Sequence, residues 1–164
     1  MKQLSLSSIN SEAPLEVTFT TSGTFAFGTE TAKYIVGFVE DQTILDSGVY
    51  QFFIENTDSS KNTLSNKVYK TIVVIIEEFF KENDSAILYI CDTSDGKQSA
   101  RDRLFSMWFN SYEGHFNYTL SRVSMQIDGI DYYASILISN SNPSYAEVLS
   151  AFKDFTNGLS EKIG

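Results

Sequence analysis

Two short segments that are apolar on both faces stand on either side of a helical pattern, and this arrangement constrains the fold most. Residues 49–55 (VYQFFIE) and 86–91 (AILYIC) have the length of strands and lack a clean polar alternation. Strands buried on both faces lie inside a sheet and usually pair in parallel through a helix. Between them, apolar residues recur at spacings of three and four: Leu64, Val68, Ile72, Ile75, Ile76, Phe79 and Phe80. The pattern predicts a helix over residues 64–83 and a right-handed parallel crossover.

The chain before this crossover predicts an antiparallel meander. Residues 15–21 alternate between apolar and polar positions, which is the period of a half-buried strand. Ser22-Gly23 supplies a turn into a strand at 24–29, and residues 33–39 form a third strand. Residues 1–13 are rich in Ser and Asn, and we expect a flexible lead-in or a first edge strand there.

The chain after the crossover predicts a helix, a hairpin and a last helix. Apolar residues at helical spacing indicate a helix over residues 98–112. Residues 116–127 and 132–139 flank Asp128-Gly129, a strong hairpin signal. A final helical pattern covers residues 144–156.

Together these segments predict an α+β fold. We expect a single mixed, mostly antiparallel sheet with one parallel crossover pair, about seven strands and three helices. The 164 residues are a common length for one domain, and the sequence has no linker or repeat. Residues 14–164 are therefore expected to form a single α+β domain.

This order of elements resembles the core of the GCN5-related N-acetyltransferase fold. Ala100, Leu104-Phe105 and Trp108-Phe109 stand where that family carries a similar helix. The resemblance implies acyl-CoA as cofactor and N-acyl transfer as activity. In that family a Gly-rich turn before the crossover helix holds the pyrophosphate, whereas residues 56–70 of this chain contain no glycine. We therefore expect no cofactor, with acyl-CoA as the alternative.

A second resemblance rests on residues 88–98 (LYICDTSDGKQ), which Ala100-Arg101 and the apolar pairs at 104–105 and 108–109 follow. The stretches 19–21, 71–80 and Asn142-Pro143 add to it. These residues resemble a family of small bacterial proteins of unknown function over most of residues 17–155. That resemblance implies no activity and supplies no catalytic residues.

The charge balance limits the partners. The chain has 21 acidic and 12 basic residues, a formal net charge of −9. Nucleic-acid binders need a basic face, so we do not expect nucleic acid as the main partner. Another protein is expected, with a basic one as the sharper form of this hypothesis. Solubility alone is the other interpretation of the charge.

Membrane and metal functions find little support. The N-terminus lacks a signal-peptide pattern, and the longest apolar run, residues 72–76, is far shorter than the ~20 residues of a membrane span. We expect a cytoplasmic protein with no membrane partner. One cysteine (Cys91) and one histidine (His115) predict neither a disulfide nor a Cys/His zinc site, so no metal is expected. The sequence identifies no catalytic residues.

Topology gives the best place for a site. If the fourth and fifth strands are parallel neighbours, their carboxyl ends open at one edge of the sheet, where α/β sheets bind ligands. The loops there predict a site for an anion or a partner segment, formed by Lys61, Lys67, Asp92, Asp95, Lys97, Gln98 and Arg101. The alternative is structural, with Asp92 and Asp95 capping the next helix, and with Arg101 and Arg103 pairing with Asp102 or with other surface carboxylates.

Two functions follow from these observations. The first is a non-catalytic binding or regulatory protein on an acetyltransferase-like scaffold. The alternative is an acyl-CoA-dependent N-acyltransferase with a degenerate pyrophosphate loop.

Overall fold

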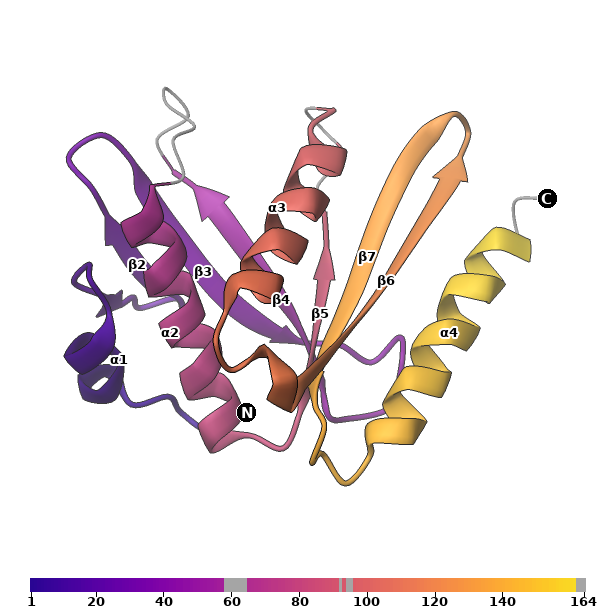
Figure 1. Cartoon of the computed structure of the whole chain (residues 1–164), viewed down its shortest axis with the longest axis horizontal. Helices are drawn as coiled ribbons and strands as arrows, with labels where there is room; N and C mark the ends of the chain where they lie inside the picture. The colour runs from indigo at the N-terminus through magenta and orange to yellow at the C-terminus, as the bar shows by residue number, and fades with distance from the viewer. Residues whose placement is uncertain (58–64, 92, 94–95, 162–164) are drawn as a thin grey trace. The chain divides into compact units, whose positions relative to one another are not determined.

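A computed structural model describes residues 1–57, 65–91, 93 and 96–161 of the chain. Within these ranges, seven strands form one mixed sheet in the order β1-β2-β3-β4-β5-β7-β6, with one parallel pair, and four α-helices accompany it (Figure 1). The predicted α+β fold with a mostly antiparallel sheet is confirmed. The chain divides into two compact units, residues 1–38 with 52–84 and residues 39–51 with 85–164. That residues 14–164 act as one domain stays a prediction.

Most of the predicted meander belongs to the first unit, and β3 and β4 each continue for a few residues into the second. Strands β1 (Thr18–Phe19), β2 (Phe25–Gly28) and β3 (Lys33–Glu40) pair antiparallel in sequence order, and β4 (Val49–Asn56) follows. The first strand is shorter than predicted. The side-chain amide of Asn10 donates to the Val17 carbonyl over 2.9 Å and accepts from the Val17 N–H over 2.8 Å. Val17 is therefore held by a side chain before the strand begins.

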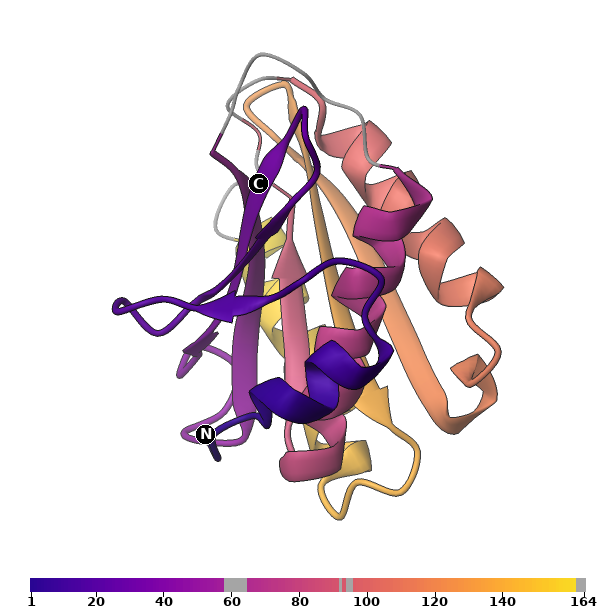
Figure 2. The ribbon, with the colours of Figure 1, turned by 90° about the vertical axis from the view of Figure 1, so that its left-hand side faces the viewer.

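Residues 1–13 differ from the expectation of a lead-in or an edge strand. Helix α1 spans Leu6–Glu12, and it makes the fourth α-helix where three were expected. The Ser5 hydroxyl accepts a hydrogen bond from the Ser8 N–H and caps the helix. Leu4 and Ile9 are buried, and α1 contacts the next helix within the unit (Figure 2). Burial of the Leu4 and Ile9 side chains explains why this segment forms a helix.

Helix α2 (Asn66–Glu82) confirms the long helical pattern. Ser65 caps it, because its hydroxyl accepts from the Val68 N–H over 3.3 Å. The apolar stripe is buried, with Ile75 and Phe79 fully inside. The Phe79 ring stacks on Phe38 with 4.6 Å between ring centroids.

The second unit contains strands β5 (Ala86–Ile90), β6 (Tyr118–Ile127) and β7 (Ile130–Ser139). Its helices are α3 (Gln98–Ser111), the 3-10 turn η1 (His115–Asn117) and α4 (Tyr145–Glu161). β7 pairs antiparallel with both β5 and β6. Asp128 and Gly129 both have positive φ, 51° and 79°, as a two-residue type I′ hairpin requires. The predicted hairpin is confirmed.

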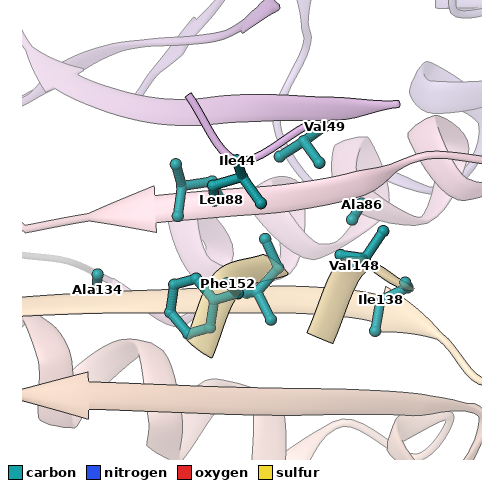
Figure 3. Close-up of a cluster of buried hydrophobic side chains, with 9 residues drawn as sticks. Ile44, Val49, Ala86, Leu88, Ala134, Ile138, Val148 and Phe152 are labelled. Carbon is teal, nitrogen blue, oxygen red and sulfur yellow. The ribbon is translucent and has the colours of Figure 1, made fainter. Parts of the chain in front are cut away.

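The core of the second unit explains why residues 86–91 are apolar on both faces. Ala86 and Leu88 point to one face of the sheet, where they pack with side chains of β7 and with Val148 and Phe152 of α4 (Figure 3). Tyr89 lies on the opposite face and stacks on Phe105 of α3, with 4.6 Å between ring centroids. Both faces of β5 are thus covered.

No helix among the described residues is long and apolar enough to cross a membrane.

Candidate functional site

The candidate site of the second unit lies where the end of β5 and the first turn of α3 meet the hairpin. The Cys91 N–H donates to the Tyr133 carbonyl over 3.1 Å, which extends the β5–β7 pairing beyond Ile90. Lys97 occupies the N-cap position of α3 and makes no side-chain capping bond. The start of this helix is therefore held by contacts other than a cap.

Gln98 supplies one of these contacts. Its side-chain Nε2 donates to the Asp131 carbonyl of β7 over 2.9 Å, although the two residues are far apart in the chain. This bond fixes which end of the amide is nitrogen, since a carbonyl accepts only from a donor. The Gln98 Oε1 is buried and has no hydrogen-bond partner in the described structure. The Gln98 side chain thus connects α3 to β7, and its buried Oε1 is left without a hydrogen bond.

Asp102 and Arg122 form the second contact between α3 and the hairpin. The Arg122 Nε donates to Asp102 Oδ1 over 3.3 Å, and the guanidinium also donates to Oδ2. The Asp102 side chain is only 6% exposed, whereas Arg122 is 42% exposed. The hydrogen bond to Asp102 raises the pKa of Arg122 above its usual value. The pair neutralises a buried carboxylate and holds α3 on the sheet.

Strand register brings Arg122 to this place. Tyr89 of β5 pairs with Ser135 of β7, and Ser135 pairs with Arg122 of β6. Residues directly opposite each other in neighbouring strands share a face of the sheet. The three residues therefore form one row across the face that α3 covers. Sequence reasoning missed Arg122 and Tyr89 because this row exists only once the register is known.

Two ionisable side chains of this region, the Cys91 thiol and the Tyr89 hydroxyl, have raised pKa values. Burial, and then the charge of Asp102, raise the pKa of the Cys91 thiol to about 11. Burial raises the pKa of the Tyr89 hydroxyl as well. At neutral pH both groups are protonated, so neither is a ready nucleophile or base.

The seven residues predicted to form an anion or partner site fall into three groups. Lys61, Asp92 and Asp95 lie outside the described residues. Lys67 is exposed in the first turn of α2, which belongs to the first unit. Lys97, Gln98 and Arg101 lie together at the start of α3 in the second unit. That all seven form one ligand site stays a prediction.

The structural alternative paired Arg101 and Arg103 with Asp102 or with other surface carboxylates. The structure adds Arg122, twenty residues along the chain, as a partner of Asp102. Capping by Asp92 or Asp95 concerns residues outside the described ranges. In the described ranges, no group of three His, Cys, Asp or Glu side chains could hold a metal ion.

An exposed apolar surface follows the site along the chain. Of the four apolar residues of α3 at 104, 105, 108 and 109, only Phe105 is buried. Met107 is 59% exposed and Phe116 is 79% exposed. Ring contacts run from Phe109 to His115 and from His115 to Phe116, with centroid separations of 6.0 Å and 4.0 Å. We call Met107, Trp108, Phe109 and Phe116 the α3–η1 surface.

Comparison with known proteins gives one match. No curated protein and no solved structure matches the chain. A family model described as a family of unknown function, DUF6169, matches residues 65–154, from the cap of α2 into α4. This match confirms the predicted resemblance to a family of unknown function, and the likeness to acetyltransferases stays a prediction. Because the match covers more than half of the sequence, the chain belongs to the DUF6169 family.

Proposed function

We propose that this protein is a non-catalytic binding protein whose partner is another protein. The observation that carries the proposal is the exposure of Met107 and Phe116 on the α3–η1 surface, with Phe116 at 79%. An isolated exposed apolar residue needs no explanation, but here ring contacts connect Phe116 through His115 to Phe109. Aromatic residues and Met are enriched at the centres of protein interfaces.

The chemistry at the start of α3 favours binding over catalysis. The Cys91 thiol, with its pKa raised to about 11, and the buried Tyr89 hydroxyl keep their protons at neutral pH. The Asp102 carboxylate is committed to Arg122. General acid–base catalysts work best with a pKa near the operating pH, and the Cys91 thiol and the Tyr89 hydroxyl do not meet that requirement.

The partner's chemistry follows from charge. A chain with net charge −9 attracts a basic protein and repels an acidic one over a distance of about 10 Å at 0.1 M salt. We therefore propose a partner with an apolar pocket for Phe116 inside a basic rim. Such a rim would speed encounter more than it would strengthen the final complex.

Photo-crosslinking tests this proposal in cells. A photoreactive phenylalanine analogue at position 116 should crosslink to a defined protein, and the same analogue at Phe19, which is 48% exposed, serves as the control. With that protein purified, Phe116→Ser should weaken binding by about tenfold or more, as interface anchors do. Phe19→Ser should leave it unchanged. A crosslink yield at 116 no higher than at 19, or equal affinity of wild type and Phe116→Ser, would refute the proposal.

Thermal unfolding with acetyl-CoA and CoA tests the alternative, N-acyl transfer. A ligand at one hundred times its dissociation constant adds ~2.7 kcal/mol, which for this length means a rise in Tm of roughly 5–10 °C. We expect no rise. A clear rise would contradict the non-catalytic proposal and favour the acyltransferase with a degenerate pyrophosphate loop.

A further inference from the structure

Strand β6 is the outer strand of the hairpin and ends the strand order at β5-β7-β6 (Figure 1). It has ten residues, and all ten pair with β7 in an unbroken register from Tyr118↔Ser139 to Ile127↔Ile130. In the described part of the chain, no strand pairs with its outer side. A long regular edge of this kind is a template for another strand.

The edge also lacks the usual protection. Natural edge strands are blocked by charged side chains, above all Lys, by Pro, by a bulge or by a very short length. β6 contains no Lys, Pro or Gly, and its single charged residue is Arg122. The Arg122 guanidinium is already paired with Asp102. Strand β1, at the other end of the strand order, has only two residues and is protected by that shortness.

Each face of β6 meets a helix of the same chain at one point, although Ser124 and Gln126 remain exposed. Val123 packs against the cluster that contains Val148 and Phe152 of α4. Arg122 points to the opposite face, where it meets Asp102 of α3. What β6 offers to a partner is therefore its backbone edge rather than a side-chain groove.

We propose that this edge pairs with β6 of a second copy of the chain, antiparallel about a two-fold axis at Val123. The register follows from strand length and charge together, because an axis near the middle of β6 pairs the most residues. With Val123 opposite itself, Arg122 faces Ser124 of the partner subunit and Leu120 faces Gln126 of the partner subunit. An axis at Arg122 would instead place two guanidiniums opposite each other, which is unfavourable. Because residues directly opposite in an antiparallel pair share a face, the helices keep their sides of the joined sheet.

The second copy fits better than a strand from a basic protein. The exposed residues of β6, Arg122, Ser124 and Gln126, leave no negative charge along the strand for a basic segment to meet. Two-fold dimers are the commonest protein assemblies, and such an interface needs only a self-complementary surface.

Two chains of charge −9 repel, so this dimer should tighten as salt rises. A contact with a basic partner would weaken instead. The inference is independent of the proposed function.

Sedimentation equilibrium of the full chain tests the proposal. The wild type should be a dimer that tightens with salt. Ser124→Lys places Lys opposite Arg122 of the partner subunit twice, and should weaken the dimer by about tenfold, from two like-charge pairs of up to ~1 kcal/mol each. Ser124→Glu should tighten it. Ser150→Lys, on an exposed position of α4, changes the net charge equally and should not weaken the dimer.

The outcomes separate clearly. A protein that stays monomeric at all concentrations and salts would overturn the proposal. A dimer that Ser124→Lys and Ser124→Glu shift in the same direction would show that the contact lies elsewhere. Thermal unfolding of each variant verifies that the chain is folded, which we expect because Ser124 is exposed.

Discussion

Helices α2 and α3 each follow a strand of the sheet, yet they are held in different ways. Helix α2 has a side-chain cap at Ser65 and a continuous buried stripe that ends at Phe79. Helix α3 has no side-chain cap and buries one apolar residue, Phe105, beside the polar residues Gln98 and Asp102. A helix held by an apolar stripe contributes mainly to stability. A helix held by two polar contacts at its sheet side leaves the Trp108 and Phe109 side chains only half-buried.

The largest expected effect on stability comes from truncating a buried side chain of α2. Phe79→Ala removes a fully buried ring that stacks on Phe38, and should lower the free energy of unfolding by about 3–5 kcal/mol. The matched change in α3, Phe109→Ala, removes a half-buried ring and should cost less than half as much. Urea unfolding of both variants measures the difference. Equal losses would mean that α3 belongs to the core as fully as α2 does.

Alkaline pH should reveal the buried thiol beside α3. The pKa of Cys91 rises from 9.0 to about 11 on folding, so the folded state keeps a proton that the unfolded state loses. Stability from this group is fully present below pH 9 and is lost between pH 9 and 11, by about 2–3 kcal/mol in total. Unfolding by urea across this range should show a shallower decline for Cys91→Ala. Parallel declines would contradict the thiol's role.

The polar contact of α3 should cost less to remove. Asp102→Ala leaves Arg122 without its carboxylate, and we expect a loss of about 1–3 kcal/mol, because Arg122 remains 42% exposed to water. A double-mutant cycle with Arg122→Met isolates the pair and should give a coupling of about 1–2 kcal/mol. Additive losses would mean that each residue acts separately.

The smallest effect concerns the caps. Ser65→Ala removes the hydroxyl that accepts from Val68, and should lower the free energy of unfolding by about 1 kcal/mol. Ser99→Ala, at an exposed position in the first turn of α3, should change it by less than about 0.5 kcal/mol. Thermal unfolding detects both. A similar loss in the two variants would remove the difference between the helix starts.

Most elements were predictable because their signals are local. The hairpin follows from Asp128-Gly129 and α2 from its apolar spacing. Helix α1 was missed because two buried residues, Leu4 and Ile9, stabilise a helix too short to show a clear period. The strand at 15–21 was overextended because the Asn10 amide pairs with Val17, a contact that no strand pattern reveals.

The candidate site was less predictable. Lys97, Gln98 and Arg101 lie near one another because they share a helix turn, and their role in a ligand site stays a prediction. Arg122 and Asp131 come from the hairpin and reach α3 only through strand register and a long chain separation. The one local signal was a charged residue within a strand that otherwise has none.

The β6–β7 hairpin also has a consequence for the order of folding. Its ten residue pairs all form within residues 118–139, so closing it needs no distant part of the chain. Hairpins of this kind form in roughly 1–10 μs, far ahead of pairings that close long loops. The outer edge of β6 would therefore exist early, before β5 and α3 have settled against β7. A newly made chain would meet other strands with this edge already formed. Early pairing with β6 of a second copy, as proposed above, would leave no open edge for a strand of another protein.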